Sequence, residues 1–440
     1  MALVAALTPL QRLARIGYAT LLRLALPAYA LRLWRRGRAE PLYRFALGER
    51  VGLYREAAGA AGWLWLHAVS LGETRAAAAL IDALRERRPG MRLLLTHGTA
   101  TGRAAGAALL RAGDAQVWLP VDTPGAVARF FDHFQPAIGV LMETEVWPNL
   151  LLEAERRAIP MVLANARLSE RSARRGEQLS ALLRPAAQSI ALVLAQTPLD
   201  AARLHAAGAR RVEVCGNLKF DVTPDAALLA RGIDWRHAAA RAVVLAASTR
   251  EGEEAALLAA WNQQSAPRAL LLIVPRHPQR FDEVAALIGA AGLRVSRRST
   301  WADAPPPAAA AADVWLGDSI GEMASYFGCA QVALLGGSFE PLGGQNLIEA
   351  AACGCPVLMG PSTFNFADAA ERALQEGAAQ RVADITAAVR LALAMVSPGA
   401  AGSESDSGQT LPSAERALAF VARHRGAAKR MAEGITALMR

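Results

Sequence analysis

The feature that most constrains the fold of this chain is a regular alternation, beginning at residue 63, of short apolar runs with Ala- and Arg-rich stretches of helical length. Such alternation is typical of a parallel sheet, because its strands are buried on both faces and each parallel connection needs a crossover helix. In the first half of the chain we expect strands at Trp63–Leu66, Leu93–Leu95, Val117–Leu119, Ile138–Met142, Met161–Ala164, Ile190–Ala195 and Val212–Val214.

The same pattern pauses around Asp221–Ala238 and then restarts. A chain of 440 residues is long enough for two domains of ordinary size. We therefore predict an α/β protein with two Rossmann-like parallel-sheet domains. In the second half we expect strands at Val243–Ala246, Leu270–Val274, Val314–Leu316, Val332–Leu335 and Pro356–Met359.

The domain boundaries follow from this pattern. After an N-terminal segment at 1–38, we expect domains at 39–222 and 241–440, joined by a linker at 223–240, with the last helices able to pack back on the first domain. The low-complexity segment Ala304–Ala312 and the Gly- and Ser-rich segment Ser397–Ser413 are expected to be structureless loops.

Composition excludes several classes of protein. Hydrophobic residues make up 53% of the chain and charged residues 20%, which excludes wholesale disorder. There are four cysteines and no paired CxxC motif, so neither a disulfide scaffold nor a structural zinc site is expected. A reducing, cytosol-facing compartment fits this cysteine usage.

The basic excess is concentrated at the N-terminus. Of the formal net charge of +9, residues 1–56 contribute a surplus of seven, from ten arginines against three glutamates. Arg12, Arg15 and Arg23 interrupt the apolar stretch, so it lacks the run of about 18–20 apolar residues that spans a membrane. We predict an interfacial helix on an anionic phospholipid surface. A helix packed on the protein body is the alternative, and nucleic acid is not expected, because base-stacking aromatics are few.

Polar residues suited to chemistry follow the strands of the first half. Glu73 lies just past the first strand, at the start of a helix whose positive end favours an ionised carboxylate. Gly72 beside it leaves room for a substrate hydroxyl. We interpret Glu73 as a candidate proton acceptor, with a purely structural first-turn glutamate as the alternative. The run Thr96–Gly102 suits either ligand contacts or helix capping.

Charged residues also follow the later strands of this half. Glu143 and Glu145 come directly after a fully apolar strand, where unpaired carboxylates are costly. Arg167, after the next strand, is a candidate partner, and a purely structural Glu–Arg pair is the alternative. Lys219 is one of two lysines among 48 basic residues, and its compact ammonium group suits a phosphate or a carboxylate.

In the second half, polar loops follow four successive strands. The pair Arg276 and Arg280 follows one of them and could clamp a phosphate by bidentate hydrogen bonds. Hydroxyls before a helix, paired glycines and a helix-starting asparagine are likewise suited to a nucleotide. The residues of this kind that we expect at the ligand are Ser248, Thr249, Gly337 and Asn346.

Eight motifs, in order along nearly the whole chain, carry a resemblance to a known family: HAVSLGE, METEVWPN, NARLSERS, GNLKFD, VPRHPQRF, GDSIGEM, GGSF and GGQNLIEA. The chain resembles the 3-deoxy-D-manno-octulosonic acid (Kdo) transferases of lipopolysaccharide assembly. These are inverting glycosyltransferases of the GT-B type, with two Rossmann-like domains facing a central cleft. Gln345 departs from the pattern, because many members carry histidine there.

The resemblance implies a reaction and a set of site residues. The donor would be CMP-Kdo, the acceptor lipid IV-A, and the location the cytoplasmic face of the inner membrane, peripheral or N-terminally anchored. Glu73 would be the general base, and Glu143 and Lys219 would stabilise the transition state. No metal or other cofactor is expected. The residues implied to hold the CMP part are Pro275, Arg276, Ile320, Gly321, Glu322, Leu347, Ile348, Glu349 and Ala350.

Two other functions stay open at this point. A GT-B transferase or nucleotide-sugar epimerase with a UDP donor would prefer UDP to CMP in competition. A basic membrane-associated or RNA-binding protein with a degenerate nucleotide fold would form no product, and its binding would collapse with salt.

Overall fold

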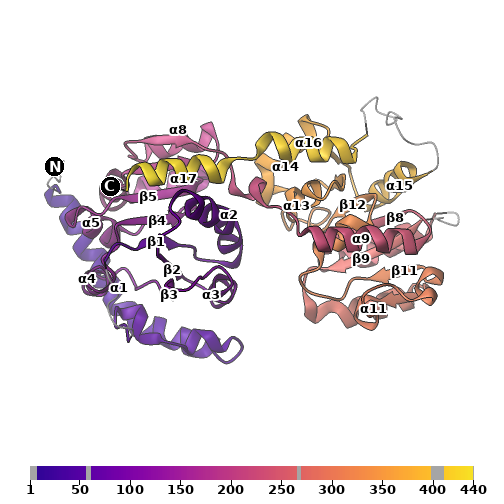
Figure 1. Ribbon diagram of the computed structural model, residues 1–440, viewed down its shortest axis with the longest axis horizontal. Helices are drawn as coiled ribbons and strands as arrows, with labels where there is room; N and C mark the ends of the chain where they lie inside the picture. Colours follow the sequence, from indigo (N-terminus) through magenta and orange to yellow (C-terminus); the bar gives the residue numbers. More distant parts are fainter. Residues whose placement is uncertain (1–6, 56–60, 265–268, 398–410, 440) are drawn as a thin grey trace. The chain divides into compact units, whose positions relative to one another are not determined.

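The computed structural model describes residues 7–55, 61–264, 269–397 and 411–439 (Figure 1). The chain divides into two compact units. The first runs to Asp221 and takes in the C-terminal residues from Arg425 onward, and the second is Val222–His424. Most of the segment expected as a Ser397–Ser413 loop lies outside the described residues.

The first unit is built on a seven-stranded, all-parallel sheet of order β3-β2-β1-β4-β5-β6-β7. All seven strands expected in the first half are confirmed. The sheet reverses its direction of growth between β1 and β4, and ligands of such sheets bind beside the carboxyl ends of the strands at this switch point. The strands are β1 (Leu64–His67), β2 (Leu93–His97), β3 (Ala115–Trp118), β4 (Ile138–Met142), β5 (Met161–Ala166), β6 (Leu192–Ala195) and β7 (Val212–Val214).

Helices cover both faces of this sheet. One face packs against α2 (Leu71–Arg87) and the C-terminal α17 (Ala427–Ala437), which lie side by side (Figure 1). Leu80 of α2 and Met431 of α17 are fully buried in the core. The other face packs against helices that bring Phe130 and the other apolar residues of the second core. The remaining helices of the unit's Rossmann-like part are α3 (Ala100–Ala107), α4 (Pro124–Phe134), α5 (Pro148–Arg156), α6 (Glu170–Gln178), α7 (Ser180–Gln188) and α8 (Pro198–Ala206).

The basic N-terminal segment forms one long helix, α1 (Pro9–Arg36), which packs on the first unit. Arg15 Nε donates to Asn149 Oδ1 at 2.9 Å, and Leu33 is buried beside Tyr43. The opposite side of α1 stays apolar and exposed, with Leu24 at 75% exposure. In the described part of the chain, none of the helices has the length and apolarity needed to cross a bilayer.

The second unit repeats the architecture with a seven-stranded, all-parallel sheet of order β10-β11-β9-β8-β12-β13-β14. Its switch point lies between β8 and β12. The five expected strands are confirmed, and β10 and β14 were missed because these three-residue edge strands carry polar side chains instead of an apolar run. The strands are β8 (Val243–Thr249), β9 (Leu270–Pro275), β10 (Val295–Arg297), β11 (Val314–Leu316), β12 (Val332–Leu335), β13 (Val357–Met359) and β14 (Ala379–Arg381).

The second sheet is likewise covered by helices. Residues 226–239, expected within a linker, form α9, which packs closely on α12: a Cβ on Gly232 would lie 2.1 Å from the Ser325 carbonyl oxygen. The helices of this unit are α9 (Ala226–Ala239), α10 (Glu253–Asn262), α11 (Phe281–Ala290), α12 (Met323–Cys329), α13 (Leu347–Ala352), α14 (Ala367–Gln375), α15 (Ile385–Val396) and α16 (Ala414–His424).

The segment Ala304–Ala312 is not structureless, so this expectation is wrong. It contains a 3-10 helix, Pro307–Ala311, whose Ala309 is buried. The Ala309 carbonyl accepts a hydrogen bond from Trp315 Nε1 at 2.9 Å. A segment of low-complexity sequence is therefore held in place by a hydrogen bond from a strand residue to its backbone.

Candidate functional site

Polar side chains gather at the carboxyl ends of the strands in each unit, and each group is described by itself. In the first unit, Glu73 follows β1. Ser70 caps the N-terminus of α2, and the Glu73 carboxylate turns back on this loop: Oε2 accepts from the Val69 amide at 2.7 Å and Oε1 from the Ser70 hydroxyl at 3.2 Å. This arrangement is close to a capping box, which a glutamate three residues after serine favours.

The protonation state expected for Glu73 needs correction. Burial, together with the nearby charges of Glu143 and Glu145, raises its pKa to about 7, against the lowering effect of its own hydrogen bonds. Burial therefore outweighs the helix dipole that was expected to keep this carboxylate ionised. A carboxylate with a pKa near neutrality exchanges protons readily at physiological pH, which suits a general base.

Gly72, next to Glu73 in the chain, leaves open space at the start of α2. A Cβ built on Gly72 would have as its nearest neighbour only the Ser70 hydroxyl, at 3.9 Å. The side of the helix start next to Glu73 is therefore open, as expected from the glycine.

Glu143 follows β4, the sheet neighbour of β1, and its backbone is in the left-handed region at φ +58°. Arg167 Nε donates to Glu143 Oε2 at 3.0 Å, which confirms the predicted pair. Lys219 lies in the 3-10 helix Leu218–Asp221 after β7. Burial lowers the pKa of Lys219, the Glu143 charge partly opposes this, and the Arg167 charge adds to the lowering. Glu143 thus interacts with two cations.

A ring of amide hydrogen bonds beside Lys219 was missed by the sequence analysis. The buried Asn165, at φ +52°, accepts from the Leu218 amide at 3.1 Å through Oδ1 and from Gln196 Nε2 at 2.9 Å through its carbonyl oxygen. Gln196 Oε1 accepts from Asn217 Nδ2 at 2.9 Å, and Asn217 Oδ1 accepts from the Lys219 amide at 3.0 Å. The visible signal was an asparagine near the end of β5 and another three residues after β7, in NARL and GNLK.

The loop Thr96–Gly102 serves helix capping, so that alternative is confirmed. Thr99 Oγ1 accepts from the Gly102 amide at 3.2 Å and donates to the Val69 carbonyl at 2.9 Å. Burial lowers the pKa of His67 to about 3 and that of His97 to about 4. Both imidazoles are therefore neutral parts of the core.

In the second unit, the loops after β8 and β12 are tied together by an acidic side chain. Glu253 accepts from the amides of Gly337 at 2.8 Å and Phe339 at 3.2 Å. The Thr249 hydroxyl donates to the buried Glu254 at 2.7 Å. Ser248, before it, is in the left-handed region at φ +57°. The Thr249 hydroxyl and the Gly337 amide are therefore already engaged within the protein.

The two arginines after β9 have different roles. Arg280 is buried and donates to Glu254 at 2.7 Å and to Glu283 at 2.9 Å, so the expectation that it clamps a phosphate is wrong. Arg276 is exposed, and its guanidinium group makes no ion pair with the described residues. It follows Pro275, the last residue of β9, and remains the cation of this loop that is open to a ligand.

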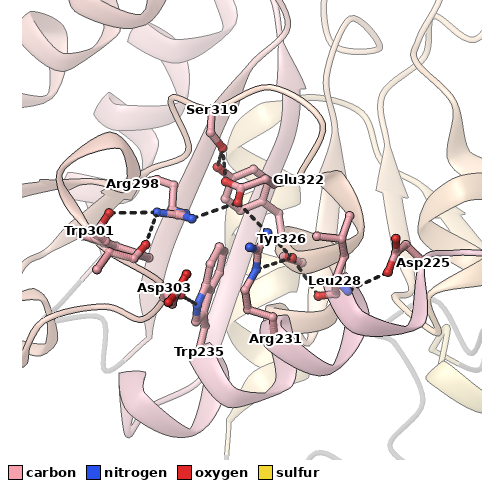
Figure 2. A network of polar contacts seen from close by, with 12 residues as sticks. Asp225, Leu228, Arg231, Trp235, Arg298, Trp301, Asp303, Ser319, Glu322 and Tyr326 are labelled. Carbon is pink, nitrogen blue, oxygen red and sulfur yellow. Dashed lines mark hydrogen bonds and ion pairs between the residues drawn. The ribbon is translucent and has the colours of Figure 1, made fainter. Parts of the chain in front are cut away.

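The loop after β11 turns its carboxylate inward (Figure 2). Glu322 Oε1 accepts from Arg231 Nη2 at 2.5 Å and from Arg298 Nη2 at 2.9 Å. Glu322 Oε2 accepts from the Ser319 hydroxyl. Ile320 is 76% exposed, and Gly321, at φ +86°, is surrounded by open space, since a Cβ added there would meet no atom within 4 Å.

The loop before α13 presents mainly its backbone. Asn346 caps the helix by accepting from the Ile348 amide at 3.2 Å, which confirms that it starts a helix. Leu347, Ile348 and Ala350 are buried, so contact with a ligand would involve their backbone atoms, whereas Glu349 is partly exposed. Within the described ranges, no group of three or more His, Cys, Asp or Glu side chains is placed to hold a metal ion.

Comparisons of the sequence with known proteins agree on one family. The model of 3-deoxy-D-manno-octulosonic-acid transferase matches residues 46–222. A 3-deoxy-D-manno-octulosonic acid transferase of Bordetella pertussis is 46% identical over 95% of this chain and 98% of its own length. The Haemophilus influenzae enzyme of the same name is 37% identical over 74% of this chain and 77% of its own. A glycosyltransferase structure from Rickettsia africae shares the fold, with a TM-score of 0.55 at 12% identity over 86% of this chain and 99% of that one.

Proposed function

We propose a specific reaction for this chain, which belongs to the 3-deoxy-D-manno-octulosonic acid (Kdo) transferase family and has the GT-B type of fold. The chain transfers Kdo from CMP-Kdo to lipid IV-A with inversion of configuration. The first unit binds the acceptor and supplies the base, and the second unit binds the donor. The observation that carries this proposal is the Glu73 carboxylate, with a pKa of about 7 beside an open glycine at the switch point of the first sheet.

In the chemical step, the role of Glu73 is to accept one proton from the acceptor hydroxyl. The acceptor hydroxyl oxygen attacks the anomeric carbon of Kdo, and its proton passes to the Glu73 carboxylate. The bond from that carbon to the phosphate oxygen breaks, and CMP leaves with the electron pair. A base with a pKa near the working pH combines a large deprotonated fraction with adequate basicity.

Charge that develops in the transition state needs fixed cations. Lys219 supplies an ammonium group. The charge of Glu143, which is itself paired with Arg167, stabilises and orients this group. The amide ring around Asn165 fixes the backbone that carries Lys219, so the cation needs little reorganisation during the reaction.

The donor is held by the loops after β8, β9, β11 and β12. Arg276 is exposed and neutralises the single phosphate of CMP. The backbones of Ile320 and Gly321 and of the segment 346–350 contact the nucleotide, with Glu349 within reach of the ribose hydroxyls. Ser248, Thr249 and Gly337 belong to the loops at the switch point of the second sheet. Thr249 is bonded to Glu254 and Gly337 to Glu253, and these bonds hold the two loops in place.

The acceptor is a lipid, so the enzyme works at the cytoplasmic face of the inner membrane. The exposed leucines of α1 and the arginines around them bind its anionic phospholipid surface, while the other side of the helix stays packed on the first unit. Mass spectrometry of lipid IV-A incubated with the protein and fresh CMP-Kdo tests the function. A product heavier by one or more Kdo residues supports it, and unchanged lipid IV-A would contradict it.

A further inference from the structure

Two guanidinium groups converge on one carboxylate beside the proposed donor loop. Glu322 is 14% exposed at its side chain, and both Arg231 and Arg298 donate to its Oε1 (Figure 2). An oxygen that already accepts two charge-assisted hydrogen bonds has little capacity left for a third donor. Its other oxygen accepts from Ser319. Three of the roughly four acceptor positions of the carboxylate are therefore engaged from the inside of the unit.

The two arginines are themselves fixed by their surroundings. Arg231, on α9, donates through Nε to Ser325 Oγ at 3.3 Å, and Arg298 donates to the carbonyls of Trp301 at 3.3 Å and Ala302 at 3.0 Å. Both guanidinium groups also lie near the ring of Trp235, with centroid distances of 5.2 Å and 5.0 Å. Cations held over an indole in this way are pre-positioned for a carboxylate.

The outward part of the loop has the opposite character. Ile320 is the most exposed of the large apolar residues that the structure describes, and Gly321 takes a positive φ that an L side chain rarely adopts. The two residues lie between Ser319 and Glu322, whose side chains are bonded to each other. The bonds of Glu322 therefore close the loop at its base and set the direction of the amides at its tip.

We propose that Glu322 is a positioning residue and not a nucleotide ligand, and that Arg231 and Arg298 set donor affinity through it without touching the donor. This inference rests on the proposed function, which puts CMP-Kdo against the tip of this loop.

The test is a double-mutant cycle on CMP affinity, measured by calorimetry with the full chain. Arg298→Met and Glu322→Gln are each expected to weaken CMP binding about tenfold, the loss that follows from a charge-assisted hydrogen bond. The double variant is expected to bind no more weakly than the weaker single variant, because both changes open the same loop. If Glu322→Gln weakens binding while Arg298→Met does not, Glu322 is a direct ligand and the inference is overturned.

A matched control lies at the other end of the same strand. Arg294 pairs with Asp313 at 2.9 Å just before β11, whereas Glu322 follows β11, so Arg294→Met removes an ion pair of the same kind away from the loop. It is expected to bind CMP as wild type does. Should Arg298→Met fail to fold, Arg298→Lys replaces it as the test. This variant keeps the positive charge but loses the branched guanidinium group, and a smaller loss of CMP affinity is expected. Wild-type affinity for that lysine variant, with wild-type affinity for Glu322→Gln, overturns the inference.

The same titration separates this inference from the function on which it rests. A wild-type protein that does not bind CMP contradicts the proposed function. A wild-type protein that binds CMP, with Arg298→Met and Glu322→Gln variants that bind equally well, contradicts only the role of the loop.

Discussion

Glu73 and Glu143 follow neighbouring parallel strands, β1 and β4, and the charge of Glu143 contributes to the raised pKa of Glu73. The two carboxylates stand at the point where the first sheet reverses its direction of growth. Only Glu143 has an ion-pair partner, in Arg167, whereas Glu73 is hydrogen-bonded to its own loop. The two carboxylates therefore have different environments, one paired with a cation and the other held by its own loop, as in pairs of catalytic acids that serve different roles.

The first prediction concerns the pH dependence of transfer. A base must be deprotonated to act, so kcat/KM should rise with pH through about 7, the pKa of Glu73 in the folded protein. Glu145→Gln removes a charge that raises this pKa, so the acidic limb should move to lower pH while the Glu143–Arg167 pair is preserved. A limb that stays in place in the Glu145→Gln variant would show that another group controls it.

The second prediction concerns stability. The folded-state pKa of Glu73 lies above its unfolded value, so the folded protein holds this proton more tightly, and the stabilisation is lost as the pH rises through about 7. Glu73→Gln mimics the protonated form. It should raise the melting temperature by about 2 °C at pH 8 and leave it nearly unchanged at pH 5. Thermal unfolding at the two pH values measures this, and an equal shift at both would argue against a raised pKa.

The third prediction concerns the amide ring at Lys219. Asn165→Gly keeps the left-handed backbone but removes the side-chain acceptor of the Leu218 amide, and transfer should fall by about tenfold or more. Asn165→Ala should lose the same activity and be less stable than the glycine variant, because alanine tolerates this φ poorly. Steady-state kinetics and thermal unfolding separate the two effects. Equal stability of the two variants would contradict the role of the backbone conformation.

The fourth prediction concerns the membrane. Replacing Leu13, Leu24 and Leu31 with glutamate introduces charge on the exposed side of α1, and flotation with anionic vesicles should be lost. The buried side of α1, which carries the bond from Arg15 to Asn149, is left intact. The matched control changes three exposed leucines elsewhere in the same unit, Leu53, Leu179 and Leu199, and should float as wild type does. If the α1 variant floats with the vesicles as wild type does, the exposed leucines of α1 do not bind the membrane.

Most of the architecture could be predicted from the sequence, because buried parallel strands are uniformly apolar and stand out from Ala- and Arg-rich helices. All seven strands of the first sheet were predicted, though not their order. In the second sheet, β10 and β14 were not predicted, since edge strands such as Ala379–Arg381 need no apolar run. The segment 307–311 is expected to be a loop from its composition, which does not reveal that a tryptophan donates to the Ala309 carbonyl.

The candidate site was predictable in its residues and less so in their electrostatics. The pairing of Glu143 with Arg167 follows from costly burial of a lone carboxylate, and the capping role of Asn346 follows from its residue type. The raised pKa of Glu73 depends on burial, which a sequence does not state. Arg280 and Arg276 look equivalent in the sequence, and only the structure shows that Arg280 is paired with Glu254.

The proton acceptor is tested most directly by transfer and CMP binding measured side by side in Glu73→Gln. This variant keeps the size of the side chain and removes the base, so lipid IV-A should remain unmodified in mass spectra while CMP binds with wild-type affinity. Appreciable formation of the Kdo-bearing lipid by Glu73→Gln, at a rate near that of wild type, would contradict the assignment of Glu73 as the base.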